Sequence, residues 1–72
     1  MTEAAFRQRV RSRERMVGTF VKTGSYQTVE VLGSSGLDFI VIDAEHAPFD
    51  RGQIDVCTLA ARAGQMGDLV RV

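Results

Sequence analysis

The sequence predicts an α/β fold in which parallel strands alternate with helices, and three observations support this. Residues 39–42 form a short, apolar, β-branched run without polar alternation, which is typical of a strand buried on both faces of a sheet. Similar runs begin near residues 17 and 68. The segments between the runs have helical patterns of apolar residues, as expected for crossovers between parallel strands.

The first two predicted elements are a helix and a strand. Thr2 is a suitable N-cap for a helix that runs to about Arg13 and places Phe6 and Val10 on its buried side. Residues 16–21 are rich in β-branched and aromatic side chains, which favours a strand.

The second helix and strand follow a polar loop. Ser25 is placed to cap a helix over residues 26–34, and Gly36 is placed to end that helix in a left-handed conformation. The next apolar run predicts the second strand over residues 38–43.

The third helix has a clear start signal. Asp50 followed by Gln53 matches a capping box for a helix over residues 51–63. A third strand is predicted from Leu69 to Val72 after two glycines. The apolar side of this helix comprises Ile54, Cys57, Leu59, Ala60, Ala61 and Ala63.

The predicted order, a helix and then β-α-β-α-β, is the opening of a barrel or of a doubly wound sheet. With 72 residues, both edges of the sheet would be open and the outer helix faces uncovered. We therefore expect residues 1–72 to be the N-terminal part of a larger single domain. We expect the isolated chain to be inactive and only partly folded or self-associated, which a cooperative melt at monomeric mass would contradict.

The composition is that of an ordinary globular protein, with 44% hydrophobic and 25% charged residues and a formal net charge of zero. This balance gives no reason to expect nucleic acid or a membrane as a partner. The one cysteine, Cys57, excludes an internal disulfide and fits a reducing compartment. No signal peptide or membrane span is evident in the sequence, so we expect a cytoplasmic location.

Three ionisable residues lie at the C-terminal end of the second strand, where α/β folds place their chemistry: Asp43, Glu45 and His46. If Asp43 accepts a hydrogen bond from one nitrogen of His46, the other nitrogen is left as a general acid or base. The alternative is that Asp43 caps the local loop. Glu45 could contact a metal ion or its bound water, or could accept from backbone N–H groups.

Two basic residues are candidates at the same end of the sheet. Arg71 lies in an otherwise apolar strand. If that strand pairs beside the second one, the side chains of Arg71 and His46 lie together at the same end of the sheet. Such an arrangement suits a small carboxylate held by the guanidinium while the imidazole handles a proton. An outward Arg71 in a salt bridge is the alternative. Lys22 follows the first strand, and a second possibility is that its amine forms a Schiff base with the substrate.

Taken together, these residues resemble the HpcH/HpaI aldolase family, whose members are class II pyruvate aldolases related to citrate lyase beta chains. The resemblance runs from Val17 onward and covers about the first quarter of the family's (β/α)₈ TIM barrel. It implies a divalent cation (Mg²⁺, Mn²⁺ or Co²⁺) and a homo-oligomer, usually a hexamer. It is carried by Gly18-Thr19-Phe20, by the string Gly36-x-Asp38-x-x-x-x-Asp43-x-Glu45-His46, and by Val70-Arg71-Val72.

The resemblance also implies roles for individual residues. His46 resembles the catalytic base that works with Asp43, Arg71 the residue that binds the pyruvate carboxylate, and Glu45 a position near the metal-bound water. The metal ligands are expected beyond Val72. The implied reaction is metal-dependent cleavage of 4-hydroxy-2-oxo acids or 2-keto-3-deoxy sugar acids to pyruvate and an aldehyde. The alternatives are a citrate-lyase-like branch acting on acyl-CoA thioesters, and a non-catalytic truncated fragment.

Overall fold

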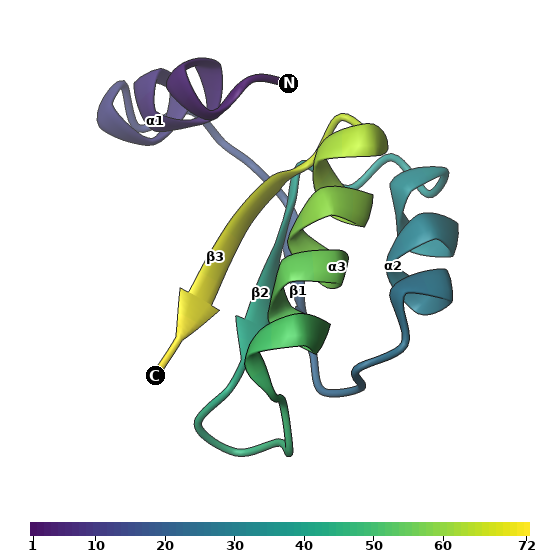
Figure 1. Ribbon diagram of the computed structural model, residues 1–72. Helices are drawn as coiled ribbons and strands as arrows, with labels where there is room; N and C mark the ends of the chain where they lie inside the picture. The colour runs from purple at the N-terminus through teal and green to yellow at the C-terminus, as the bar shows by residue number, and fades with distance from the viewer.

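A computed structural model describes residues 1–72 and shows a three-stranded sheet with two helices packed on one face (Figure 1). The strands lie in the order β1-β2-β3, and both neighbouring pairs are parallel. The predicted α/β class and element order are therefore confirmed. The elements are α1 (Glu3–Arg11), β1 (Gly18–Val21), α2 (Tyr26–Gly33), β2 (Phe39–Asp43), α3 (Arg51–Ala63) and β3 (Gly67–Arg71).

The hydrophobic core lies between the sheet and the helices α2 and α3. Alternate residues of the central strand β2, Ile40 and Ile42, point into it and are fully buried. The two helices approach closely at one end, where a Cβ built on Gly64 would lie 3.0 Å from the Cα of Gly33. The core residues are Val21, Val29, Ile40, Ile42, Cys57, Ala60, Ala61 and Met66.

The opposite face of the sheet is covered only at the N-terminal ends of the strands, where α1 lies (Figure 1). Phe6 of α1 is buried there, and its ring centroid lies 5.9 Å from that of Phe39. A Cβ on Gly67 would lie 2.3 Å from the Phe6 ring, so the ring rests directly on the backbone of β3. Further along the same face, Phe20 and Leu69 are about half exposed, at 53% and 48%.

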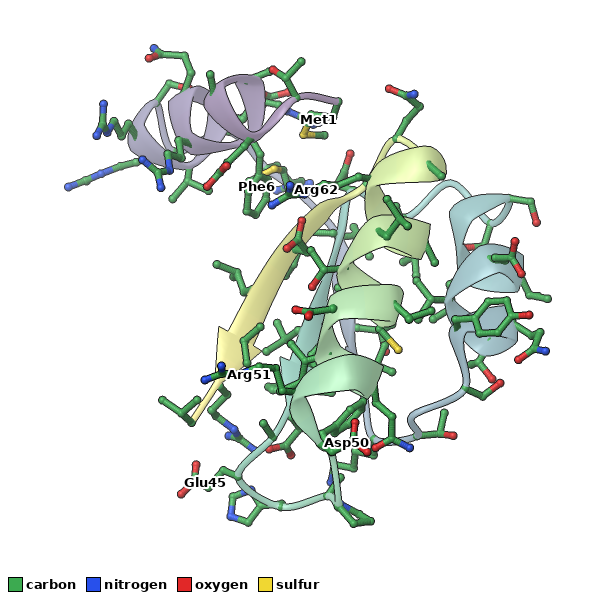
Figure 2. All side chains as sticks on the ribbon, viewed as in Figure 1. Met1, Phe6, Glu45, Asp50, Arg51 and Arg62 are labelled. Atoms are coloured by element: carbon green, nitrogen blue, oxygen red, sulfur yellow. The ribbon has the colours of Figure 1, made fainter.

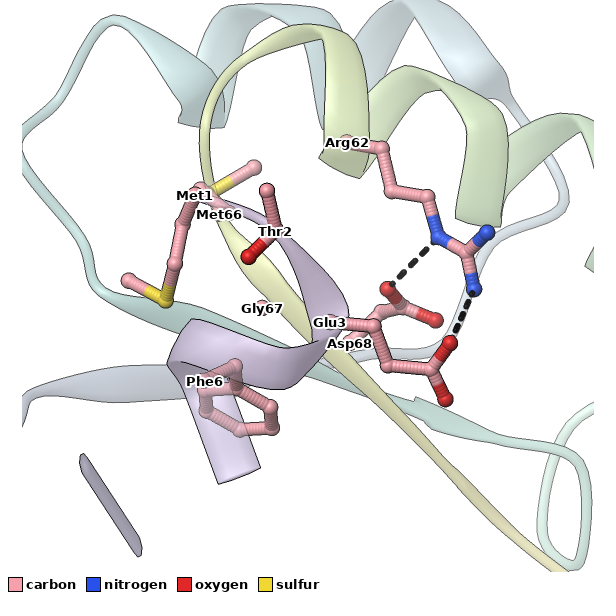
Figure 3. A pocket seen from close by; sticks show the side chains of 8 residues that line it. All are labelled: Met1, Thr2, Glu3, Phe6, Arg62, Met66, Gly67 and Asp68. Atoms are coloured by element: carbon pink, nitrogen blue, oxygen red, sulfur yellow. Dashed lines mark hydrogen bonds and ion pairs between the residues drawn. The ribbon is translucent and has the colours of Figure 1, made fainter. Parts of the chain in front are cut away.

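Ion pairs hold α1 against the start of β3. Figure 3 shows Arg62 of α3 between two carboxylates, with its Nε 3.4 Å from Asp68 Oδ1 and its Nη2 3.9 Å from Glu3 Oε2. These residues help to line a small pocket that also includes Phe6 and Gly67. The pocket lies at the N-terminal end of β3, far from the strand ends that carry the candidate site.

Several predicted boundaries are confirmed. The helix α3 has the predicted bounds, and its capping box is formed: Asp50 Oδ1 accepts from the N–H of Gln53 at 2.7 Å, while Gln53 Oε1 accepts from the N–H of Asp50 at 3.0 Å. Gly36 has a φ of +87°, in the left-handed region, as predicted, but the helix α2 already ends at Gly33, with Ser34 as its C-cap. None of the three helices is both long and apolar enough to cross a membrane.

The first helix is shorter than predicted. It ends at Arg11 because the hydroxyl of Ser12 donates to the carbonyl of Gln8 and Arg13 takes a left-handed φ of 56°. The prediction that Val10 is buried was wrong, since this side chain is 51% exposed. Only Phe6 of this helix is buried.

Three further details differ from the predictions. The strand β3 begins at Gly67 rather than Leu69, because the N–H of Gly67 already donates to the carbonyl of Asp38 at 2.8 Å. The strand β1 begins at Gly18, since the N–H of Val17 is taken by the Asp38 carboxylate at 2.9 Å. Leu59 was predicted on the buried side of α3 and is instead 68% exposed.

Candidate active site

The parallel register brings the candidate residues to one end of the sheet. Asp43, the last residue of β2, pairs with Arg71, the last residue of β3, so their side chains leave the same face at the same height. The N–H of Ala44 donates to the carbonyl of Arg71 at 3.0 Å, so the pairing continues into the loop after β2. Glu45 lies in this loop, below the strand ends in Figure 2. The spatial arrangement expected from the sequence is therefore present.

Arg71 and Asp43 form a two-pronged ion pair. The distance is 2.8 Å from Nη2 to Oδ2 and 3.3 Å from Nε to Oδ1. Asp43 is fully buried, whereas the side chain of Arg71 is 40% exposed, so the guanidinium lies between the carboxylate and solvent. The hydrogen bonds from Arg71 hold the pKa of Asp43 well below its usual range, with a smaller contribution from the N–H of His46. The same pairing raises the pKa of Arg71.

Asp43 also organises the loop that carries His46. Its Oδ1 accepts a hydrogen bond from the backbone N–H of His46 at 3.0 Å, which is the loop-capping arrangement considered as an alternative above. The imidazole of His46 is 56% exposed, and its Nδ1 lies 3.4 Å from Asp43 Oδ2. The carboxylate therefore fixes the His46 backbone and lies next to its ring.

The nearest partner of the His46 ring is Arg71, whose Nη2 lies 2.8 Å from Nδ1. A guanidinium can only donate hydrogen bonds, so Nδ1 must act as the acceptor in this contact. In the tautomer that forms this hydrogen bond, the ring proton lies on Nε2. Asp43 and Arg71 thus compete for the same ring nitrogen.

Glu45 completes the charged group without forming a metal site. Its Oε2 lies 3.6 Å from Arg71 Nε, and its Oε1 lies 3.9 Å from His46 Nε2. At these distances it contributes charge rather than direct hydrogen bonds. No group of three or more His, Cys, Asp or Glu side chains in the chain could hold a metal ion.

Two further residues belong at this end of the sheet. Lys22 follows β1, but its side chain takes part in none of the hydrogen bonds or ion pairs of the charged group. Phe20 was not predicted as a site residue, yet Arg71 Cζ lies 4.9 Å from the centroid of its ring. The strand register could have identified it, because Phe20 pairs with Val41 and therefore shares the face of Asp43 and Arg71.

Comparison with known proteins relates the chain to carbon–carbon lyases, although no protein-family model matches it. It is 28% identical over 67 residues to a hydroxypyruvate/pyruvate aldolase of Roseobacter denitrificans. It is 31% identical over 67 residues to a 5-keto-4-deoxy-D-glucarate aldolase of Salmonella paratyphi A. In each case the match covers 93% of this chain and 26% of the relative. The chain therefore spans about a quarter of the length of the curated relatives it matches.

Solved structures give the same picture. The citrate synthase SbnG superposes with a TM-score of 0.82 at 31% identity, over 90% of this chain and 26% of that protein. A HpcH/HpaI aldolase/citrate lyase family protein of Burkholderia cenocepacia superposes with a TM-score of 0.76 at 30% identity, over 96% of this chain and 27% of that protein. The resemblance to the HpcH/HpaI aldolase and citrate lyase family is thus confirmed in sequence and in fold, with the 72-residue chain matching about a quarter of such a protein.

Proposed function

We propose that this chain is part of a pyruvate aldolase that cleaves 4-hydroxy-2-oxo acids or 2-keto-3-deoxy sugar acids. The observation that carries the proposal is the contact between Arg71 and His46 at the ends of neighbouring strands. It joins a fixed positive charge, which suits a substrate carboxylate, to a group that can move a proton. The aldolases to which the chain is similar act on related acids.

In the proposed mechanism, Arg71 binds the carboxylate of the 2-oxo acid. Its Nε and Nη2 are engaged by Asp43, whereas Nη1 forms no hydrogen bond in the structure. The substrate therefore approaches the Nη1 side of the guanidinium. Asp43 holds the opposite edge and keeps the group charged and oriented.

Substrate binding also prepares His46 for proton transfer. As the substrate carboxylate draws the guanidinium away from Nδ1, the exposed ring loses its Nε2 proton to solvent and takes up a solvent proton at Nδ1. The Nδ1–H group then donates to Asp43 Oδ2, which is already 3.4 Å away. The ring proton then resides on Nδ1, and Nε2 becomes the base that accepts the proton of the 4-hydroxyl group. Loss of that proton leads to cleavage of the carbon–carbon bond, which releases the aldehyde and leaves the pyruvate enolate beside Arg71.

The divalent cation implied by the resemblance is a separate expectation. The residues of this chain do not supply a ligand set for it, so no step above depends on a metal. If the cation takes part, its ligands come from outside residues 1–72. The expected homo-oligomer and cytoplasmic location are likewise proposals for the complete protein.

The test uses the complete polypeptide that we propose to contain this chain. We expect it to release pyruvate from a 2-keto-3-deoxy acid, and His46→Ala to lose about 100-fold or more of this rate because general acid–base catalysis is removed. Lys22→Ala should keep the rate, and borohydride in the presence of pyruvate should not label Lys22. Full activity in His46→Ala would refute the proposal.

A second candidate is carbon–carbon bond formation rather than cleavage. It is favoured by one observation, the superposition on the citrate synthase SbnG. The same arginine and histidine could hold an oxo acid as acceptor. Incubation of the polypeptide with oxaloacetate and an acyl-CoA thioester would separate the two, since only the synthase would release free CoA.

A further inference from the structure

We propose that Phe20 is a positioning residue for Arg71, and that its ring keeps the guanidinium in the plane in which Nη1 faces the substrate carboxylate. This proposal rests on the proposed function for the identity of the substrate. The contact itself does not depend on the substrate. It joins residues of β1 and β3, two strands that are not neighbours in the sheet.

The strand register explains how the contact arises. Phe20 of β1 pairs with Val41 of β2, and Arg71 of β3 pairs with Asp43, two residues further along β2. All four side chains therefore lie on the face that α2 and α3 do not cover. To reach the ring, the side chain of Arg71 must bend back over the end of β2, across roughly two strand spacings of about 4.8 Å each.

The ring and the carboxylate constrain different motions of the guanidinium. Asp43 binds the edge formed by Nε and Nη2, and this pair of bonds resists rotation within the plane of the group. Arg71 Cζ lies over the Phe20 ring, 4.9 Å from its centroid, which is within the range of a cation–π contact. A flat ring resists tilting but allows the guanidinium to slide, as the proposed release of His46 requires.

The exposure of Phe20 supports a role beyond core packing. Its side chain is 53% exposed and is not part of the hydrophobic core, whereas Val21, the next residue, is 3% exposed and belongs to it. Replacement of Phe20 should therefore affect the site more than the packing beneath the helices.

The experiment compares Phe20→Leu, Phe20→Trp and a control, Tyr26→Leu, in the complete polypeptide. Tyr26 is also an aromatic residue with 43% exposure, but it lies on α2, away from the charged group. The first readout is the NMR signal of the Arg71 Nε–H group, assigned by its disappearance in Arg71→Lys. A ring-current shift should be lost in Phe20→Leu and retained in Phe20→Trp and Tyr26→Leu.

The second readout is kinetic. Phe20→Leu removes the cation–π contact with Arg71. A partly exposed contact of this kind predicts that KM for the oxo acid rises by roughly 3- to 30-fold, whereas kcat falls by a smaller factor. Phe20→Trp should restore KM, which a loss of simple packing would not predict. An unchanged Arg71 signal in Phe20→Leu, or an unchanged KM, would overturn the proposal. If no oxo acid is cleaved by the parent protein but the Arg71 signal still shifts only in Phe20→Leu, the positioning role stands and the proposed function falls.

Discussion

The contact between Phe6 and Gly67 predicts opposite effects for the same substitution at two glycines. In Gly67→Ala, the new Cβ would lie 2.3 to 2.6 Å from three atoms of the Phe6 ring, about 1 Å inside ordinary van der Waals contact. In Gly52→Ala, on the exposed first turn of α3, the nearest atom would be Asp50 Oδ1 at 3.4 Å, which is tolerable. The first substitution overpacks a buried contact, and the second only removes backbone freedom from the unfolded chain.

The magnitudes follow from these distances. Overpacking of a buried site typically costs about 1–3 kcal/mol, whereas glycine to alanine in a helix stabilises by roughly 0.5–1 kcal/mol. In a complete barrel domain, where 1 kcal/mol shifts Tm by about 2–4 °C, Gly67→Ala should lower Tm by roughly 2–12 °C. Gly52→Ala should raise it by roughly 1–4 °C.

The assay is thermal unfolding of the complete polypeptide by scanning calorimetry, with a third variant as control. Phe6→Leu removes the ring edge that Gly67 faces, so the double variant with Gly67→Ala should lose less stability than the two single losses added together. We expect a coupling free energy of at least about 0.5 kcal/mol. A neutral or stabilising Gly67→Ala, or strict additivity with Phe6→Leu, would refute the placement of α1 across the start of β3.

Four further predictions concern the charged group and the cap of α3. Arg71→Lys should raise KM for the oxo acid by about 10- to 150-fold, as expected for loss of one charge-assisted hydrogen bond, and steady-state kinetics would check this. In the ligand-free protein the ring proton of His46 should lie on Nε2 and should move to Nδ1 when pyruvate is added, which ¹⁵N NMR of the imidazole would detect. The pKa of Asp43 in the folded protein is below its unfolded value, so its stabilising effect is complete above about pH 3.9 and is lost as the pH falls through the folded pKa. In Asp43→Asn, the free energy of unfolding should therefore depend less steeply on pH in the acid range, as measured by acid unfolding. Asp50→Ala should destabilise by about 0.5–2 kcal/mol through loss of the N-cap, as measured by urea unfolding.

The local signals in the sequence predicted most of the fold correctly. The capping box at Asp50 and the left-handed Gly36 are short-range features that depend on residues within one turn, and both are present. Leu59 was misassigned because the apolar stripe of α3 is wider than the surface that the sheet covers, and periodicity does not reveal which edge of the stripe is left out.

The grouping of the candidate residues was predictable from the sequence, but their contacts were not. Strand order and register place Asp43, His46 and Arg71 together. The alternation of strands and helices predicted parallel strands, but the pairing of the third strand beside the second was only a condition of the prediction. The hydrogen-bond partner of His46 Nδ1 depends on the conformation of the long Arg71 side chain, which the sequence spacing does not predict. The register places Phe20 on the same face as Arg71, but the contact between them depends on the same bend of the arginine side chain.

Each end of the central strand β2 has a carboxylate, Asp38 directly before it and Asp43 as its last residue, and the two are bound in the same way. Asp38 accepts from the N–H of Val17 and from Arg9, as Asp43 accepts from the N–H of His46 and from Arg71. Both carboxyl groups have lowered pKa values, so protonation in acid weakens both anchors of β2. An activity profile measured at low pH will therefore mix proton chemistry with loosening of the scaffold. Asp38→Asn, which leaves the reacting groups untouched, is the variant that separates the two contributions.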